Sequence, residues 1–185
     1  MPTAAIIGGG VIGSGWAARF LLNGWDVRFF DPSADAERVL QAVIERGREA
    51  MPALSDAVPQ EGRLVIADST ADAVAGAVYI QESTPERIEI KQAVLRSIQE
   101  ACDEAAIVAS STSGFMPTEL QEGALRPEQI IVSHPYNPVY LLPLVEVVAS
   151  PKVSPELIQR ASNVLESLSM KPIVLGAEVP AHVGD

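Results

Sequence analysis

A glycine-rich turn near the amino terminus constrains the fold more than any other stretch of the chain. Residues 8–13 read G-G-G-V-I-G, which satisfies the pattern G-x-G-x-x-G. The apolar run 3–7 before the turn predicts a strand, the run 11–22 after it predicts a helix, and the run 25–30 predicts a second strand. This succession of strand, glycine turn, helix and strand within about 30 residues is typical of one βαβ unit.

The rest of the chain continues the alternation of strand and helix patterns. The clearest helix pattern is 86–101, where Ile90, Val94 and Ile98 recur along one face. Further strands are expected at 64–66, 77–80, 106–109, 130–133, 144–148 and 172–175, and further helices at 34–50, 72–75 and 155–168. This order predicts an α/β fold: a Rossmann-like, doubly wound, mostly parallel sheet with helices on both of its faces.

Composition narrows the class of protein. The 185 residues suit one domain, and a hydrophobic content of 48% suffices for one substantial core. The net charge of −11 argues against a nucleic-acid partner, because phosphates favour Lys and Arg. The single cysteine, Cys102, fits a reducing compartment, and the sequence shows neither a signal peptide nor an apolar run long enough to span a membrane. We therefore expect a cytoplasmic protein without membrane contact.

The glycine turn predicts a dinucleotide site. In such a turn the first glycine, Gly8, permits the tight bend, and the second, Gly10, lets a pyrophosphate approach the backbone. The third, Gly13, lets the helix pack closely against the strand. The helix that begins with Val11 and Ile12 then offers free N–H groups and a positive dipole to the phosphates.

Asp31 ends the second expected strand and indicates which dinucleotide binds. A carboxylate at this position accepts hydrogen bonds from the adenosine ribose hydroxyls and repels a 2′-phosphate, and no cation follows before Arg38. The sequence therefore favours NAD over NADP. The plainer alternative is a glycine-rich turn followed by an aspartate that caps the next helix.

A second group of residues lies around His134. The run 130–133 leads into His134, and Pro135 then stops regular structure, so we expect the imidazole at the carboxyl end of a buried strand. Open α/β sheets bind their ligands at that edge. Glu146 stands inside the apolar run 144–148, where a carboxylate needs a partner. The expected partner is His134.

Together with the glycine turn, these residues predict a dehydrogenase that acts on a small-molecule substrate. A neutral His134 can take a proton from a substrate hydroxyl while hydride leaves the same carbon, and Glu146 would orient the imidazole. Ser113 could hold the substrate oxygen, and Asn137 could position substrate or nicotinamide. Plainer roles stay open: a structural histidine, a Ser113 that caps a helix near Pro117, and a Glu146 paired with a lysine. A hydrolase is a minor alternative, because the chain has no G-x-S-x-G elbow.

Several segments resemble a known family in their order and spacing. They are Gly8–Gly13, Asp31, Thr84–Glu86 with Lys91, Ser111–Ser113, and His134–Pro138 with Glu146. On these residues the chain is similar, over almost its whole length, to the NAD-binding domain of the 3-hydroxyacyl-CoA dehydrogenase family. The resemblance implies that His134 is the catalytic base, that Glu146 is its partner and that Ser113 contacts the substrate oxygen and the nicotinamide. It also implies cofactor contacts from Glu86, Lys91 and Asn137, and no metal.

The resemblance extends to the substrate. Runs 13–16, 110–114 and 137–146 are most similar to family members that oxidise L-carnitine to 3-dehydrocarnitine with NAD. The alternatives are a 3-hydroxyacyl-CoA such as 3-hydroxybutyryl-CoA, gulonate, or a non-catalytic NAD-binding module. Tyr136 and Tyr140 are candidates to contact a quaternary ammonium group, since such groups favour aromatic faces.

We expect residues 1–185 to form one NAD-binding domain. The helical C-terminal domain of the family, through which its members typically form homodimers, is absent from this sequence, and residues 181–185 look like a seam to such a domain. We therefore expect the isolated chain to turn over poorly, because closing the substrate pocket needs the second domain.

Overall fold

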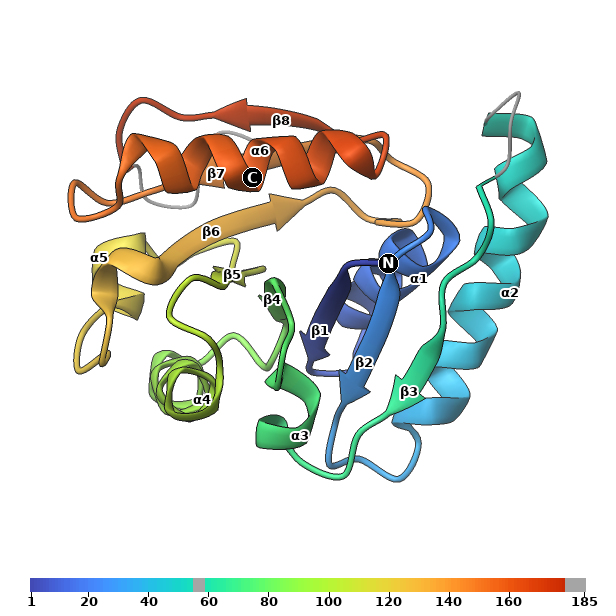
Figure 1. Ribbon diagram of the computed structural model, residues 1–185, viewed down its shortest axis with the longest axis horizontal. Helices are drawn as coiled ribbons and strands as arrows, with labels where there is room; N and C mark the ends of the chain where they lie inside the picture. Colours follow the sequence, from blue (N-terminus) through green and yellow to red (C-terminus); the bar gives the residue numbers. More distant parts are fainter. Residues whose placement is uncertain (55–58, 179–185) are drawn as a thin grey trace.

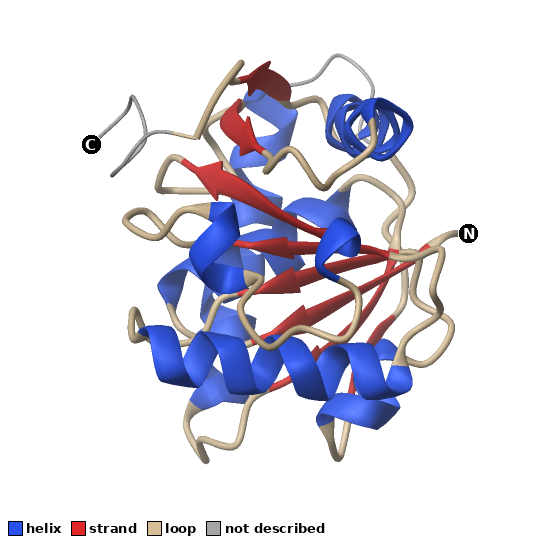
Figure 2. Cartoon of the chain, turned by 90° about the vertical axis from the view of Figure 1, so that its left-hand side faces the viewer, coloured by secondary structure: helices blue, strands red, loops and turns tan. Residues whose placement is uncertain are grey.

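One eight-stranded sheet organises the part of the chain that the computed structural model describes, residues 1–54 and 59–178 (Figure 1). Its strands are β1 (Thr3–Ile7), β2 (Asp26–Phe30), β3 (Leu64–Ile66), β4 (Tyr79–Glu82), β5 (Ile107–Ser110), β6 (Ile130–Pro135), β7 (Leu144–Val148) and β8 (Lys171–Val174). They lie in the order β3-β2-β1-β4-β5-β6-β7-β8. Strands β1 to β6 are parallel, β7 pairs antiparallel with β6, and β8 runs parallel to β7. Most strand arrows accordingly point the same way in Figure 2.

Helices cover both faces of this sheet. They are α1 (Val11–Leu22), α2 (Ala36–Leu54), α3 (Thr70–Val74), α4 (Ile88–Ala101), α5 (Pro117–Leu120) and α6 (Pro155–Ser167), with a 3₁₀ turn η1 (Pro127–Gln129) before β6. Residues of β1 alternate between two apolar cores, Ala4 and Ile6 in one and Ala5 and Ile7 in the other. The first core includes α1, α2 and α6, and the second includes α3, α4 and α5. The Rossmann-like, doubly wound fold predicted from the sequence is confirmed.

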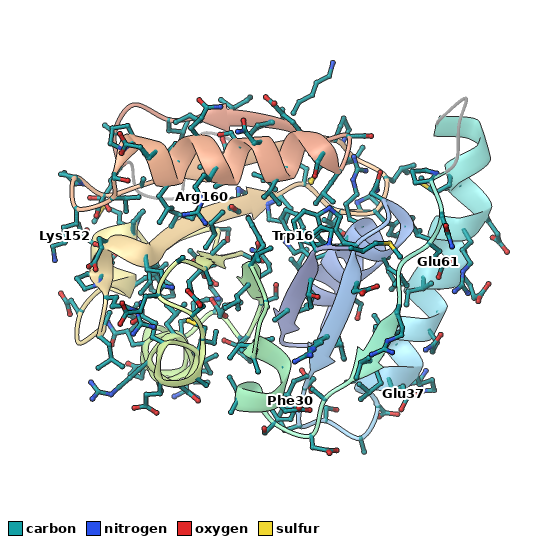
Figure 3. All side chains as sticks on the ribbon, viewed as in Figure 1. Trp16, Phe30, Glu37, Glu61, Lys152 and Arg160 are labelled. Carbon is teal, nitrogen blue, oxygen red and sulfur yellow. The ribbon has the colours of Figure 1, made fainter. Side chains whose placement is uncertain are left out.

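Helix α1 is the central helix of the first core. Its residues from Gly13 to Leu22 are buried, and Trp16, which is fully buried, lies in the interior beside the sheet (Figure 3). By contrast, Glu37 and Lys152 are exposed at the periphery of the same view. Among the described residues, no helix is both long and apolar enough to span a membrane.

Strand β4 ends two residues later than the sequence predicts. It was expected at 77–80 but spans Tyr79–Glu82. The prediction was wrong because Gln81 and Glu82 are polar, and polar residues usually mark the end of a buried strand. Both side chains are nevertheless fully buried, and they hydrogen-bond inside the protein.

Strand β6 also continues past its expected end. Pro135 was expected to stop the strand, but it pairs with Val145 as the last residue of β6. A proline is tolerated there because the pairing between β5 and β6 has already ended at Val132, so Pro135 has no β5 neighbour that its missing N–H would have to reach. His134 therefore lies inside the strand, directly opposite Glu146 of β7.

The elements expected at 3–7, 11–22, 64–66 and 144–148 are found with the expected bounds, and the others are found with shifted ends. The helix expected at 34–50 is α2, and the one expected at 72–75 is α3, where the Ser69 side chain caps the first turn by accepting a hydrogen bond from the Asp72 N–H at 3.1 Å. A helix begins at Pro117, as expected. The expected seam at 181–185 lies outside the described residues.

Arg19 connects α1 by hydrogen bonds to segments next to β7 and β8. Its side chain is only 6% exposed and donates hydrogen bonds to the carbonyl oxygens of Leu168 (2.9 Å), Ser169 (2.7 Å) and Tyr140 (3.3 Å). Burial lowers the pKa of this guanidinium, and all three of these acceptors are backbone carbonyls. Arg19 thus joins the helix that follows the glycine turn to the end of α6 and to the loop that leaves β6.

We predict that Arg19→Met lowers the free energy of unfolding by about 2–3 kcal/mol, because buried carbonyl groups lose charged donors. Arg46→Met is the matched control: Arg46 is exposed on α2 and should change stability by less than about 0.5 kcal/mol. Denaturant unfolding of both variants measures the difference. Equal midpoints for the two variants would contradict this role of Arg19.

Candidate active site

Two neighbouring cavities lie along the carboxyl edge of the parallel strands. The larger has a volume of about 750 Å³ and is lined by the glycine turn, Asp31 and residues of α2 and α4. The smaller has a volume of about 310 Å³ and includes His134. Ser83 and Thr84, which follow β4, line both cavities. The two spaces therefore meet where β1 and β4 lie side by side, which is the position where the sheet reverses its winding and doubly wound proteins bind ligands.

The glycine turn has the geometry that a dinucleotide needs. Gly8 has φ +102°, a conformation that favours glycine, and a Cβ on Gly13 would lie 1.8 Å from the carbonyl oxygen of Gly8. A Cβ on Gly10, by contrast, would meet nothing within 4 Å. Gly10 is also the N-cap of α1, and no side chain caps the helix there. The first N–H groups of α1 thus face open space beside the larger cavity, which fits a pyrophosphate.

Asp31 lines the larger cavity and supports the glycine turn. Its Oδ2 accepts a hydrogen bond from the Gly9 N–H at 2.6 Å, and its Oδ1 accepts one from the Ser33 N–H at 2.7 Å. It does not cap α2, which begins at Ala36, so the plainer alternative for Asp31 is wrong. Arg38, the next cation, is exposed and pairs with Asp35 at 3.3 Å.

His134 and Glu146 form the pair that the sequence predicts. They face each other across the antiparallel strands β6 and β7, and 2.9 Å separates His134 Nδ1 from Glu146 Oε2. The two side chains are 11% and 3% exposed. The imidazole lines the smaller cavity. A ring held through Nδ1 by a buried carboxylate, with its other side toward a cavity, has the arrangement of a general base.

Of the two other polar residues predicted beside His134, the structure brings one to the cavity. Ser113 lines the smaller cavity, and it does not cap α5, whose N-cap is Met116. Asn137 is exposed and lines neither cavity. The structure therefore gives no support to Asn137 as a cofactor contact in the described arrangement.

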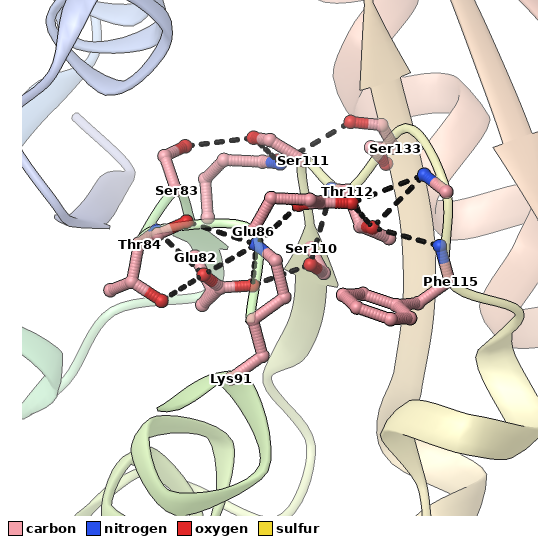
Figure 4. Close-up of polar contacts among 12 residues, drawn as sticks. Glu82, Ser83, Thr84, Glu86, Lys91, Ser110, Ser111, Thr112, Phe115 and Ser133 are labelled. Atoms are coloured by element: carbon pink, nitrogen blue, oxygen red, sulfur yellow. Dashed lines mark hydrogen bonds and ion pairs between the residues drawn. The ribbon is translucent and has the colours of Figure 1, made fainter. Parts of the chain in front are cut away.

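Glu86 and Lys91 both line the smaller cavity and belong to one network of charged groups (Figure 4). The buried Lys91 ammonium lies 3.1 Å from Glu82 Oε1, 3.1 Å from the Thr84 carbonyl oxygen and 3.3 Å from Glu86 Oε2. Glu82 is fully buried and also accepts hydrogen bonds from Thr84 and Ser110. The three acceptors match the three donors of an ammonium group.

Glu86 remains ionised within this network. Burial alone would raise its pKa, but a hydrogen bond from the Thr112 hydroxyl, the charge of Lys91 and the Gly114 N–H at 3.1 Å together lower the pKa below its ordinary value. The carboxylate also links the loop after β4 to the loop after β5. Direct contact of Glu86 and Lys91 with NAD remains a prediction.

Sequence reasoning missed the hydrogen bonds that join the polar residues at the end of β4 to those after β5. Glu82 holds Lys91 and Ser110, and Ser111 hydrogen-bonds to Trp16, Gln81 and Ser83. The polar run Gln81–Thr84 could have indicated these contacts. It follows an apolar run directly, and the polar run Ser110–Ser113 does the same. It was overlooked because β4 was expected to end before it.

The chain matches the family model described as 3-hydroxyacyl-CoA dehydrogenase, NAD binding domain, over residues 3–179. It is 59% identical to an L-carnitine dehydrogenase/betainyl-CoA thioesterase of Ruegeria pomeroyi, over 100% of this chain and 38% of that protein. It is 48% identical to an L-carnitine dehydrogenase of Mesorhizobium japonicum, over 98% of this chain and 50% of that protein. The chain thus spans no more than half the length of these two relatives.

Solved structures with the same fold include two dehydrogenases. The 5-formyl-3-hydroxy-2-methylpyridine 4-carboxylic acid 5-dehydrogenase, an NAD⁺-dependent dismutase, superposes with a TM-score of 0.91 at 33% identity, over 99% of this chain and 60% of that chain. The 3-hydroxybutyryl-CoA dehydrogenase of Escherichia coli superposes with a TM-score of 0.83 at 25% identity, over 94% of this chain and 38% of that chain. The chain therefore belongs to the 3-hydroxyacyl-CoA dehydrogenase family, of which it carries the NAD-binding domain.

Proposed function

We propose that the chain is the NAD-binding part of an NAD-dependent dehydrogenase that oxidises the 3-hydroxyl group of L-carnitine to the ketone of 3-dehydrocarnitine. The observation that carries this proposal is the His134–Glu146 pair, with Nδ1 and Oε2 2.9 Å apart, at a cavity that adjoins the glycine turn. A module that only binds NAD has no use for a buried carboxylate opposite a histidine.

The residues of the larger cavity would bind most of the cofactor, and those of the smaller cavity would carry out the reaction. The glycine turn and Asp31 would hold the adenosine and pyrophosphate of NAD in the larger cavity, which leaves the smaller cavity for the nicotinamide and the substrate carbon. Bound NAD supplies the hydride acceptor. Nε2 of His134 takes the proton of the substrate hydroxyl, and Glu146 stabilises the imidazolium that forms. Ser113, on the same cavity, would donate a hydrogen bond to the substrate oxygen.

The relatives at 48% and 59% identity, whose names include L-carnitine dehydrogenase, support carnitine as the substrate. The ring of Tyr136 lies next to that of His134, with centroids 5.8 Å apart, which makes it the nearer aromatic candidate for contact with the quaternary ammonium, although it lines neither cavity. Tyr140 packs against the core of α1 and α2 instead, and it is therefore the weaker candidate. A 3-hydroxyacyl-CoA is the second candidate, because the E. coli 3-hydroxybutyryl-CoA dehydrogenase shares this fold at 25% identity.

We further propose that residues 1–185 form one domain and that activity needs the helical C-terminal domain of the family. This proposal is supported by the share of the relatives that the chain covers, 38% and 50%. A homodimer would then form through that second domain, and the chain alone should turn over substrate slowly.

NADH formation tests the substrate most directly. We expect the chain, joined to a helical C-terminal domain of the family, to reduce NAD with L-carnitine and not with 3-hydroxybutyryl-CoA. Activity with the CoA ester alone would show that the substrate is a 3-hydroxyacyl-CoA and not L-carnitine. Activity with neither substrate, while NAD is bound, would contradict both.

His134→Ala should lower kcat by about 10²–10⁴-fold, the usual contribution of a general base, and leave the affinity for NADH within about twofold. Steady-state kinetics on the two-domain protein and NADH fluorescence titration on the chain measure the two effects separately. If NADH affinity fell as far as kcat, His134 would be a structural residue and not the base.

Asp31→Ala should weaken NAD binding by about tenfold and narrow the preference for NAD over NADP, since the charge that repels a 2′-phosphate is lost. Asp31→Asn separates the two roles of this side chain. Its amide oxygen can still accept from the Gly9 N–H, which Asp31 holds at 2.6 Å, but the charge is gone. Both variants should therefore narrow the preference. An unchanged ratio of NAD to NADP affinity in both would contradict a ribose contact by Asp31.

A further inference from the structure

A row of four polar side chains lies at the junction of the two cavities. The hydroxyl of Ser111 is its centre: Trp16 Nε1 lies 3.1 Å from Ser111 Oγ, Gln81 Nε2 lies 2.7 Å from it, and Ser83 Oγ lies 2.7 Å from it. Trp16 and Gln81 are fully buried, whereas Ser83 and Ser111 are partly exposed; Ser83 lines both cavities and Ser111 lines the smaller one. Figure 4 shows the contact between Ser83 and Ser111.

The donors and acceptors of this row can be assigned by counting protons. An indole N–H can only donate, and so can the nitrogen of a side-chain amide. Ser111 therefore accepts from both Trp16 and Gln81, which fills both lone pairs of its oxygen. Its own proton must then go to the third partner, the oxygen of Ser83.

The orientation of the Gln81 amide, on which this count depends, is set by a second neighbour. Gln81 Nε2 also lies 3.3 Å from the carbonyl oxygen of Ser133, a group that only accepts. If the amide were turned around, two acceptor oxygens would face each other. The oxygen of the amide, Oε1, is buried and has no hydrogen-bond partner among the residues described, so the orientation rests on the contact of Nε2 with the Ser133 carbonyl oxygen.

The count leaves Ser83 with an uncommitted donor. Its oxygen accepts the proton of Ser111, and within residues 1–54 and 59–178 its own proton has no acceptor. Thr84, the other residue shared by both cavities, is the opposite case. Its hydroxyl donates to Glu82 Oε1 at 2.6 Å, so it can offer only lone pairs to a ligand.

We propose that the Ser83 hydroxyl is a cofactor-binding donor that hydrogen-bonds to an oxygen of the dinucleotide where it passes from the larger cavity into the smaller. The proposal rests on the proposed role of NAD. Between its two nucleoside halves NAD presents phosphate and ribose oxygens, and the phosphate oxygens can only accept. The row fixes the direction of the donor before NAD arrives, because Ser111 has no lone pair left for the Ser83 proton.

The test compares two variants of the whole chain, Ser83→Ala and Ser111→Ala. Both remove the hydrogen bond between the two serines, but only the first removes the outward donor. NADH affinity is measured by fluorescence titration, AMP affinity by competition with NADH, and folding by thermal unfolding. AMP serves as the probe of the larger cavity alone.

We expect Ser83→Ala to lower the affinity for NADH by about 3- to 10-fold, the effect of one hydrogen bond, and to change the affinity for AMP by less than about twofold. Ser111→Ala should unfold at a lower temperature, because Trp16 and Gln81 lose their buried acceptor, but should bind NADH within about twofold of the unaltered chain. Equal loss of NADH affinity in both variants, equal loss of AMP and NADH affinity in Ser83→Ala, or no loss in Ser83→Ala would each overturn the proposal while NAD binding itself stands. If the unaltered chain bound no NADH, the cofactor assignment would fail and this proposal with it.

Discussion

The candidate site depends on one constraint of the backbone: β1 and β4 are neighbours in the sheet, but the chain winds away from them in opposite directions. The helices that follow the two strands consequently lie on opposite faces, and a crevice remains above the carboxyl ends of the strands. The glycine turn enters this crevice from β1, and Ser83 and Thr84 enter it from β4. Because β5 and β6 continue the sheet in the same direction, Ser113 and His134 reach the same edge.

The antiparallel pairing of β6 with β7 adds the second requirement, a fixed partner for His134. Directly opposite residues of two paired strands project to the same face, so Glu146 reaches the imidazole without a flexible loop. The buried ion pair of Glu82 and Lys91 likewise fixes the loop after β4. Lys91 donates to Glu82 and to the Thr84 carbonyl oxygen, and Glu82 accepts from the hydroxyls of Thr84 and Ser110. Separating either pair would leave a buried charge without its partner, which is costly.

The sequence predicted those parts of the site that depend on local patterns. The glycine turn, Asp31 and the His134–Glu146 pair each carry a residue type that is costly or unusual where it stands, and the structure brings each to one of the two cavities or beside it. The polar run Gln81–Thr84 was visible in the sequence, but its hydrogen bonds to Trp16 and Ser111 were not, because these residues lie on separate elements and meet only once the sheet has formed. Asn137 lies three positions after His134 in the chain, but it is exposed and lines neither cavity, so its contact with the cofactor stays a prediction.

We infer that one dinucleotide spans both cavities and ends beside His134. A crystal structure of the chain with NADH tests it most directly. We expect the adenosine next to Asp31 in the larger cavity and the nicotinamide ring in the smaller cavity, against Ser113 and within reach of a substrate carbon whose hydroxyl His134 can deprotonate. Adenosine bound elsewhere, or a nicotinamide ring outside the smaller cavity, would show that NAD does not span the two cavities.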